Sequence, residues 1–195
     1  GKNNLFFDPK DKYHLSAFAK SYIAGLLTHI REITLILCQW VNSYKRLVVG
    51  YEAPVYISWG RRNRSSLIRV PMYQPGKENA TRVELRCPDP ACNPYLAFAV
   101  MLAAGMKGVE GKYSLTEPVE EDIYEMDEKE LKRHKIGSLP SSLPEAIDLA
   151  EKSPLVREVL GGHLFTNLIA NKRMEWDRYR MHVSQYEIDT FLPVL

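Results

Sequence analysis

Hydrophobic residues first recur at helical spacing in a segment that begins at Ser16. Ser16 is a suitable N-cap residue, and small and apolar residues follow it from Ala17 to about Leu35. A side-chain hydroxyl in front of a periodic apolar run is the usual start of an amphipathic helix. The pattern therefore predicts one long helix near the start of the chain.

The pattern changes to strand-like alternation after residue 42. β-Branched and aromatic residues alternate over 55–59, and short runs of similar character occupy 66–70 and 81–87. Pro71 ends the second run, and the Pro-Gly pair within 73–79 predicts a turn before the third. We therefore expect three strands in the middle of the chain.

An almost continuous apolar run follows at 94–104. Asn93 supplies an N-cap, and Pro94 occupies the first helical position, where proline costs no hydrogen bond. Because the run is apolar all round, it predicts a buried core helix, which we expect Gly105 and Gly108 to end.

The last third of the chain alternates between polar and helical patterns. The acidic segment 117–135 predicts a loop with a short exposed helix. Start signals at Ser142, at Ser153 and near Ser184 predict three more helices, with a break at Gly161-Gly162. The order of one helix, three strands and further helices predicts an α+β fold.

The composition is that of an ordinary globular protein. The 195 residues include 45% hydrophobic and 26% charged residues, which excludes disorder as the overall description. No run of about 18 uncharged apolar residues is present, so we expect no membrane span, and we also expect no secretory signal. The three cysteines lack CxxC spacing. We therefore predict a cytoplasmic protein whose cysteines fill core space.

Charge is segregated along the chain although the net charge is only +2. Residues 45–86 carry nine basic and three acidic side chains, whereas residues 117–151 carry eleven acidic and four basic ones. An arginine-rich half suits a multiply charged anion, such as a nucleotide or a carboxylate substrate. A solvated surface with scattered arginines is the alternative.

Glu84 lies in the most informative predicted strand. Strand alternation places Arg82, Glu84 and Arg86 on one face and Cys87 on the other, inward face. Flanking guanidinium groups favour the ionised carboxylate, which is a suitable ligand for Mg²⁺ or Mn²⁺. The alternative is a surface ladder of opposite charges, which stabilises by well under about 1 kcal/mol per pair.

A second group of arginines follows the first predicted strand. Arg61, Arg62 and Arg64 stand close together, and Arg69 follows five residues later. Guanidinium groups suit phosphate oxygens. Nearby aromatic residues keep a single-stranded nucleic-acid binder open as an alternative, but the pI of about 8.4 is low for such a module.

Glu52 lies on a loop between Gly50 and Pro54. A carboxylate on such a loop can act as a general base or bind a cation at a mobile flap, whereas an exposed loop acid is the alternative. The five histidines show no metal-ligand spacing, and neither a glycine-rich phosphate loop nor a Ser-His-Asp pattern is evident.

Six linked motifs resemble the C-terminal half of type I glutamine synthetase. In chain order they are Asn42-Ser-Tyr-Lys-Arg-Leu47, Gly50-Tyr-Glu-Ala-Pro54, Ser58-Trp-Gly-Arg-Arg-Asn-Arg-Ser65, Ile68-Arg-Val-Pro71, Arg82-Val-Glu-Leu-Arg-Cys-Pro-Asp-Pro90 and Asn93-Pro-Tyr-Leu96. The resemblance covers essentially the whole chain. It implies the glutamine synthetase catalytic-domain fold, in which antiparallel strands pack with helices, with residues 1–195 forming its C-terminal portion.

The resemblance implies an activity in nitrogen assimilation. The family joins ammonia to L-glutamate at the expense of ATP, through γ-glutamyl phosphate and with Mg²⁺ or Mn²⁺. The implied partners are L-glutamate, ammonium, ATP and further copies of the chain, assembled as a dodecamer of two stacked hexamers. The apolar C-terminal tail, residues 191–195, resembles the family's inter-ring tail.

The resemblance also assigns roles to individual residues. It places Glu52 as the flap glutamate that helps to take a proton from ammonium, and Arg64 as the group on the transferring phosphoryl. It assigns glutamate contacts to Arg46, Glu52, Arg64 and Arg86. It assigns ATP contacts to Arg64, Arg69, Lys77 and Arg82, and one metal ligand to Glu84. Phosphoryl transfer needs spread positive charge and a metal more than covalent catalysis, in agreement with this set.

The chain also departs from the family pattern. Cys38-Gln39-Trp40 replaces Asn-Pro-Thr, and Val49 replaces the proline before the flap motif. The family's other metal ligands and its N-terminal domain lie upstream of the matching region, so we expect the 195 residues in isolation to be inactive. Tyr124 occupies the position that one family branch adenylylates, and its surroundings predict no modification.

Two rival functions remain open within the superfamily. One is a ligase that γ-glutamylates an amine other than ammonia, such as a polyamine. The other is a catalytically inactive truncated or assembly relative. Nucleic-acid binding is the weakest alternative, and we expect no nucleic-acid partner.

Overall fold

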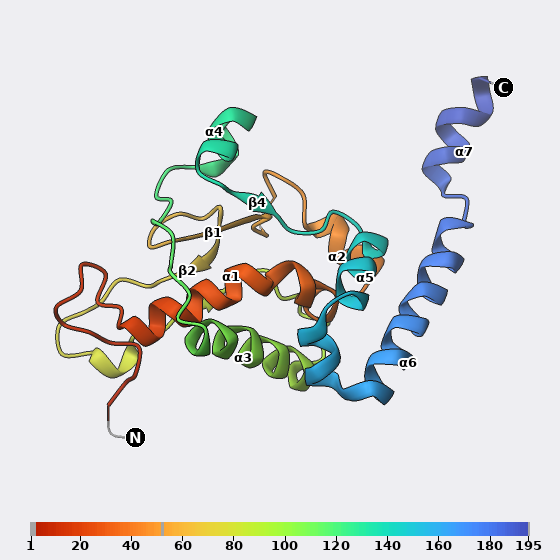
Figure 1. Cartoon of the computed structure of the whole chain (residues 1–195). Helices are drawn as coiled ribbons and strands as arrows, with labels where there is room; N and C mark the ends of the chain where they lie inside the picture. The colour runs from red at the N-terminus through yellow and green to blue at the C-terminus, as the bar shows by residue number, and fades with distance from the viewer. Residues whose placement is uncertain (1–2, 52, 195) are drawn as a thin grey trace.

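The computed structural model describes residues 3–51 and 53–194, and it confirms the predicted α+β class (Figure 1). The helices are α1 (Ala17–Leu37), α2 (Val41–Arg46), α3 (Pro94–Glu110), α4 (Glu128–Arg133), α5 (Leu143–Glu151), α6 (Pro154–Arg180) and α7 (Gln185–Phe191). The strands are β1 (Tyr56–Gly60), β2 (Ser66–Arg69), β3 (Glu84–Leu85) and β4 (Gly137–Ser138). Short 3-10 turns are η1 (Glu78–Ala80), η2 (Ile123–Glu125) and η3 (Leu192–Val194).

The four strands form one small mixed sheet in the order β3-β2-β1-β4. β3 and β4 pair antiparallel with their neighbours, but β1 and β2 are parallel, with Tyr56 opposite Ser66 and Gly60 opposite Arg69. The expectation of antiparallel strands is therefore wrong for the central pair. Only residues 61–65 join β1 to β2, whereas a parallel connection ordinarily needs a dozen residues or more. We call residues 61–65 the arginine loop.

Helix α1 begins where the sequence predicts. The Ser16 Oγ accepts a hydrogen bond from the Ala19 amide at 3.1 Å, which satisfies one of the free amides of the first turn. The helix runs two residues past the predicted end, to Leu37. Ile23, Ile30 and Leu37 are fully buried, so α1 forms the centre of the core.

Helix α3 lies against α1 along most of its length (Figure 1). The prediction that Gly105 and Gly108 end this helix is wrong, because both glycines lie inside it and allow close packing. A Cβ on Gly108 would lie 2.1 Å from the Ser21 carbonyl oxygen, and one on Gly105 would lie 2.1 Å from the Tyr22 ring. The glycines therefore act as contact points between helices.

One side of α3 faces away from the core. Tyr95, Phe98 and Leu102 expose 83%, 69% and 58% of their surface, although Ala97, Val100 and Ala104 are buried. The expectation of a helix buried all round is therefore wrong, because an apolar sequence does not say how many neighbours are present to cover it.

The third predicted strand is shorter than its pattern. Only Glu84–Leu85 pair as β3, although the pattern extends over 81–87. The six-residue helix α2 and the two-residue strand β4 carry no pattern that the sequence reading detected. β4 pairs with β1 through Tyr56 and Ile57, so the segment after the acidic region closes the free edge of β1.

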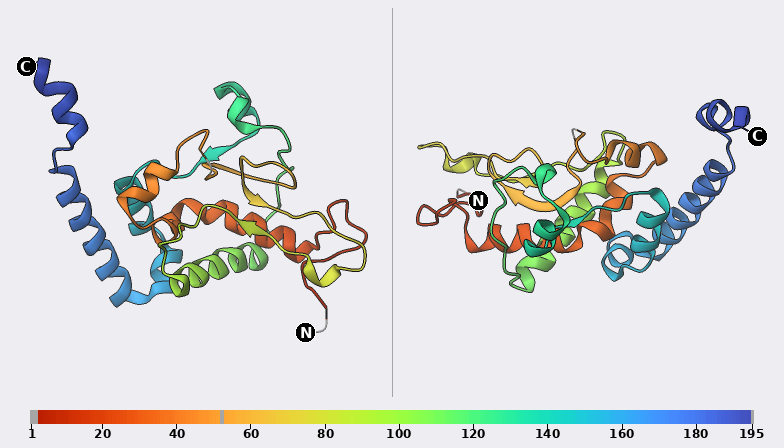
Figure 2. Two further views of the ribbon diagram at one scale, coloured as in Figure 1. Left: turned by 180° about the vertical axis from the view of Figure 1, so that it is seen from behind. Right: turned by 90° about the horizontal axis from the view of Figure 1, so that it is seen from above.

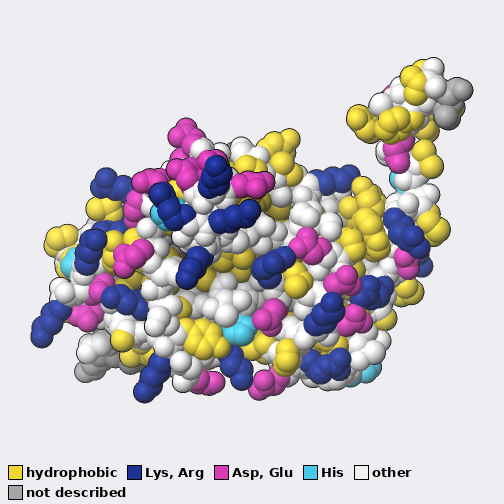
Figure 3. Space-filling view, turned by 45° about the horizontal axis from the view of Figure 1, so that its top comes forward, with side chains coloured by type: hydrophobic (Ala, Val, Ile, Leu, Met, Phe, Trp, Pro, Cys, Tyr) yellow, Lys and Arg dark blue, Asp and Glu magenta, His cyan; other side chains and the backbone are white. Residues whose placement is uncertain are grey.

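Helix α6 carries the chain out of the globular body. Gly161 has a φ of 71° and kinks this helix, which agrees with the predicted break. Beyond it the later turns of α6 and all of α7 project as an arm (Figures 1 and 2). No described residue of α7 is buried, and apolar side chains gather at the tip of the arm (Figure 3). Within the described residues, no helix has the length and apolar character needed to cross a membrane.

Candidate active site

The arginine loop and the chain around β3 line a cavity of about 710 Å³. We call it the donor-side cavity. It is bordered by the loop, by the chain that follows β2 and by the residues before β3. Its cationic lining residues are Arg61, Arg62, Arg64, Arg69, Lys77 and Arg82. Such a concentration of guanidinium groups favours a polyanion, because each planar group can give paired hydrogen bonds to phosphate oxygens.

A second cavity, of about 850 Å³, lies on the other side of the arginine loop. We call it the acceptor-side cavity. Arg46, Arg64 and Arg86 supply its cationic groups, and Asp122 and Tyr124 come from the acidic region. Three guanidinium groups with one carboxylate suit a small anionic substrate that also carries a positive charge.

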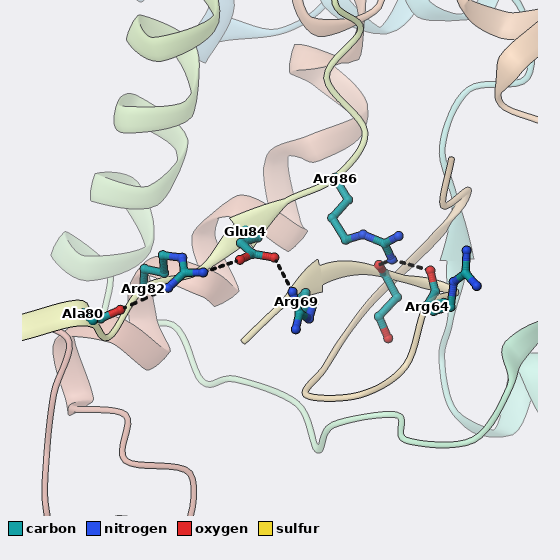
Figure 4. Close-up of polar contacts among 7 residues, drawn as sticks. Arg64, Arg69, Ala80, Arg82, Glu84 and Arg86 are labelled. Atoms are coloured by element: carbon teal, nitrogen blue, oxygen red, sulfur yellow. Dashed lines mark hydrogen bonds and ion pairs between the residues drawn. The ribbon is translucent and has the colours of Figure 1, made fainter. Parts of the chain in front are cut away.

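Arg64 lines both cavities. The Arg86 guanidinium donates hydrogen bonds to the carbonyl oxygens of Arg64 and of Ser66, the latter at 3.3 Å (Figure 4). This contact fixes the backbone of Arg64 from the β3 side, while the Arg64 side chain stays exposed. Arg64 therefore lies where a group bound in one cavity meets a group bound in the other.

Both carboxylate oxygens of Glu84 are paired with arginines (Figure 4). One accepts from Arg69 at 2.9 Å and the other from Arg82 at 2.9 Å. Arg86, the other flanking arginine, instead turns its guanidinium to the backbone of the arginine loop. The antiparallel pairing of β2 with β3 places Arg69 opposite Glu84, a neighbour that the alternation within one strand could not reveal.

The described residues do not by themselves fit a divalent metal site. Among them no group of three or more His, Cys, Asp or Glu side chains is placed to hold a metal ion. Glu84 offers one carboxylate, and Mg²⁺ or Mn²⁺ prefers about six oxygen ligands. Each carboxylate oxygen has two lone pairs, so Glu84 could supply one ligand while Arg69 and Arg82 stay paired with it.

Arg46 contributes to the acceptor-side cavity through a guanidinium held by backbone atoms. Its Nη2 donates to the carbonyl oxygens of Cys87 at 3.0 Å and Pro88 at 3.1 Å. An arginine has five N–H donors, so these contacts leave others for a ligand. Arg46 is thus oriented by the chain that follows β3, whereas Arg86 is oriented by the arginine loop and the start of β2.

Glu52 lies outside the described residues. Its neighbours Tyr51 and Ala53 line the acceptor-side cavity, and the Tyr124 hydroxyl donates a long hydrogen bond of 3.5 Å to the Tyr51 carbonyl oxygen. Burial raises the pKa of Tyr124, and the nearby Arg86 partly offsets this rise. The phenol is therefore a neutral donor at ordinary pH.

The sequence reading missed an aromatic wall in the donor-side cavity. His14 and Tyr73 line it, with ring centroids 4.5 Å apart, and the Tyr73 hydroxyl donates to the Glu78 carboxylate at 2.7 Å. His14 has a φ of 56°, a conformation that few residues other than glycine adopt. These residues are about 60 positions apart, so no local pattern could have joined them.

The cysteines lie beside the site without lining either cavity. Cys38 and Cys87 are fully buried, and Cys92 is partly exposed, so the core-filling prediction holds for the first two. Burial raises the pKa of Cys38 to about 12, and it raises that of Cys87 well above the ordinary thiol value. Both thiols are therefore inert structural groups.

Two arginine-lined cavities that share Arg64 thus adjoin the small mixed sheet of this α+β domain. The family model for the glutamine synthetase catalytic domain matches residues 1–191. The chain belongs to this family.

Curated relatives agree with this assignment. The chain is 50% identical to glutamine synthetase of Mycolicibacterium smegmatis, over 98% of this chain and 43% of the relative. It is 52% identical to glutamine synthetase of Methanosarcina mazei, over 98% of this chain and 42% of the relative. The chain therefore spans less than half the length of the curated relatives it matches.

Solved structures give the same fold. A GmaS/ADP complex superposes with a TM-score of 0.84 at 32% identity, covering 98% of this chain and 43% of that chain. Apo GmaS without ligand superposes with a TM-score of 0.80, also at 32% identity, covering 97% of this chain and 41% of that chain. The small mixed sheet, α1 and α3 therefore belong to a fold shared with ligand-binding relatives.

Proposed function

We propose that this chain is the C-terminal part of a glutamate–ammonia ligase, which forms L-glutamine from L-glutamate, ammonium and ATP. The observation that carries the proposal is the position of Arg64 on the boundary between two arginine-lined cavities. A transferring phosphoryl group must touch a donor and an acceptor at once, and it gains most from a cation that both can reach.

The donor-side cavity would hold the phosphates of ATP. Arg69 and Arg82 already converge on Glu84, so they lie in a fixed orientation before a polyanion arrives. Lys77 is exposed at the same cavity and adds a mobile positive charge. Fixed guanidinium groups reduce the reorganisation that charge transfer would otherwise require.

The acceptor-side cavity would hold L-glutamate. Arg46 and Arg86, each oriented by backbone carbonyls, would bind a carboxylate of the substrate, and Arg64 would face the carboxylate that receives the phosphoryl group. Glu52, next to this cavity in the chain, would accept a proton from ammonium. The carboxylate would take the γ-phosphoryl group of ATP with release of ADP, and ammonia would then attack the acyl phosphate, which gives the amide and releases phosphate.

A divalent ion would neutralise the charge of the phosphates when it is bound. Glu84 would be one of its ligands, and further ligands would have to come from outside the described residues. The ion is part of the proposal because the family chemistry requires phosphate charge to be spread, and the steps assigned above use only the side chains of this chain.

The apolar arm would serve self-association. Tyr186, Phe191 and Val194 expose 71%, 53% and 78% of their surface on a helix pair that leaves the body. Exposed apolar surface of this kind is unusual on a monomer and favours burial against another subunit. A homo-oligomer of the family type, two stacked hexamers, agrees with this arm.

The test uses a chimera with a relative of known length. Residues 4–194 of this chain would replace the matching segment of Methanosarcina mazei glutamine synthetase, and phosphate release from Mg-ATP would be measured. Release that depends on both L-glutamate and ammonium is expected. The same chimera carrying Arg64→Ala is the negative control, and the isolated chain should release no phosphate.

The alternative that this assay decides is a ligase that joins glutamate to an amine other than ammonia. Solved structures that match this chain at 32% identity are named GmaS rather than glutamine synthetase, so we include other amines as candidate substrates. Methylamine and a diamine would therefore be tested beside ammonium. Faster release with either one would favour a γ-glutamyl-amine ligase, and no release from a folded chimera would favour an inactive assembly relative.

A further inference from the structure

Residues 119–124 run beside the arginine loop, and we call them the bracing segment. The Asn63 side chain joins the two. Its Nδ2 donates to the carbonyl oxygens of Val119 at 2.9 Å and of Glu121 at 2.5 Å. Asn63 itself exposes only 6% of its surface. An arginine-rich loop at the surface is thus attached through a buried carboxamide.

The other side of the same carboxamide is also occupied. The Asn63 Oδ1 accepts from the Ser65 amide at 2.8 Å and from the Ser65 Oγ at 2.5 Å. Ser65 Oγ in turn accepts from the Ile123 amide at 3.1 Å. The result is a closed, buried chain of hydrogen bonds. A buried polar network with every member paired fixes one geometry, because each unpaired alternative leaves a costly orphan group.

These contacts do more than form a local turn. The bond from Ser65 to Asn63 spans two residues, as in any Asx turn, but the two Nδ2 bonds reach segments 56 and 58 positions away. Glu120 adds a second attachment, since its carboxylate accepts from the amides of Arg61 and Arg62 at 3.0 and 3.2 Å.

Arg64 lies between the two anchored residues. In the turn that Asn63 and Ser65 form, both of these side chains face inward, and Arg64 between them is exposed. Asn63 and Ser65 are both buried, and the Arg64 side chain is exposed at both cavities. The bracing segment also supplies Asp122 and Tyr124 to the acceptor-side cavity. One support therefore holds both the wall of that cavity and the arginine at its edge.

We propose that Asn63 is the positioning residue for Arg64: its carboxamide fixes the arginine loop on the bracing segment and so fixes the Arg64 guanidinium at the boundary of the two cavities. The inference rests on the proposed function for the role of Arg64 in phosphoryl transfer. The attachment of the loop is a property of the described contacts alone.

The first test measures anion binding by calorimetry on the 195-residue chain, with inorganic tripolyphosphate as the probe. Arg64→Ala is expected to weaken binding about tenfold, since it removes a charged donor. Asn63→Ala should weaken tripolyphosphate binding by most of the same factor, although it does not change the charge of the chain. The double variant should bind no more weakly than Arg64→Ala alone, because residues that act through one another are not additive.

Asn63→Ala combined with Arg82→Ala is the comparison for two residues that act independently on anion binding. Arg82 lines the same cavity from a different segment, so the losses of Asn63→Ala and Arg82→Ala should multiply. Asn167→Ala is the control for loss of a carboxamide, because Asn167 donates to the His163 carbonyl oxygen on the exposed side of α6. This control should leave tripolyphosphate affinity unchanged.

The second test follows amide hydrogen exchange and needs no bound anion. Asn63→Ala should speed exchange at the Ser65 and Ile123 amides and leave the Val156 amide, which bonds to Ser153, unchanged. If Asn63→Ala fails to fold, Ser65→Ala is the second variant. Ser65→Ala removes the Oγ bridge and keeps the backbone amide. It should give a smaller loss of tripolyphosphate affinity, which should also be non-additive with the loss from Arg64→Ala.

Each outcome decides one of the two claims. The positioning role is overturned if the losses of tripolyphosphate affinity from Asn63→Ala and Arg64→Ala multiply. It is also overturned if Asn63→Ala leaves amide hydrogen exchange at Ser65 and Ile123 unchanged. Failure of the unaltered chain to bind tripolyphosphate counts against the donor-side cavity and hence against the proposed function, while the exchange result still decides whether Asn63 holds the loop.

Discussion

Glu84 joins two segments of the chain through its paired arginines. Arg82 comes from the same segment as Glu84, and Arg69 comes from the neighbouring strand through an antiparallel pairing. Alternation within one strand predicts the first partner and the buried position of Cys87. It cannot predict the second partner, because pairing between strands depends on distant chain segments.

The first prediction concerns Arg64 in the chimera with the Methanosarcina mazei protein. Arg64→Ala should lower turnover about a thousandfold and weaken ATP binding only about tenfold, because a group aimed at the transferring phosphoryl acts mainly in the transition state. Steady-state kinetics and calorimetric ATP binding are the two measurements. Equal losses in both would contradict a transition-state role.

The second prediction concerns the thiols. At pH 7.5 a thiol-specific disulfide reagent should label Cys92 slowly and leave Cys38 and Cys87 unlabelled, since burial raises the pKa of all three and most of all that of the two buried ones. Labelling of Cys92 should accelerate as the pH rises, because the thiolate is the reactive form.

Mass spectrometry of the labelled native protein would identify the sites. Unfolding in urea should make all three thiols reactive, which provides the internal control. Rapid labelling of Cys38 in the folded protein would show that the chain around β3 opens far more readily than its burial implies.

At the scale of secondary structure, long periodic segments were predictable and short ones were not. The N-caps Ser16, Asn93 and Ser153 each start a helix, because a cap is a local arrangement of a few residues. The C-terminal end of α3 was mispredicted because glycine has two opposite uses. It can end a helix, or it can let a second helix approach, and only the presence of α1 decides between them.

The third prediction follows from this contact. Gly108→Ala should lower the free energy of unfolding by about 2 kcal/mol or more, because the new Cβ would lie 2.1 Å from a backbone oxygen of Ser21 that cannot turn aside. Gly162→Ala is the matched control, since no atom lies within 4 Å of its Cβ position. Gly162→Ala should leave the free energy of unfolding unchanged or raise it by about 0.5–1 kcal/mol.

Urea unfolding followed by circular dichroism would measure both variants. If Gly108→Ala and Gly162→Ala proved equally stable, α1 and α3 would have to be farther apart than the structure places them.

At the scale of the whole molecule, the apolar arm differs from the body in how its surface is used. The core around α1 buries its apolar residues within one chain, whereas the described residues of α7 bury none. Sequence reasoning identified the tail as apolar, but the projection of the arm depends on the kink at Gly161 and on packing against α5.

The fourth prediction is a deletion of the arm tip. Removing residues 182–195 should change the free energy of unfolding by less than about 0.5 kcal/mol, because exposed segments contribute little to the core. The same deletion should reduce self-association in sedimentation velocity. A large loss of stability with unchanged association would contradict both statements.

The connection between the parallel strands β1 and β2 has a consequence for loop length. A Cβ built on Gly60 would lie 3.1 Å from the Ser66 Oγ, so the arginine loop leaves the sheet and rejoins it at nearly the same place. Asn63 and Ser65, on either side of Arg64, both bond to the bracing segment. Adding or removing one residue between these two anchors would turn Arg64 away from the boundary of the cavities. The spacing of Asn63, Arg64 and Ser65 therefore works as a molecular ruler, and we expect natural variation in the loop to change side chains but not the number of residues.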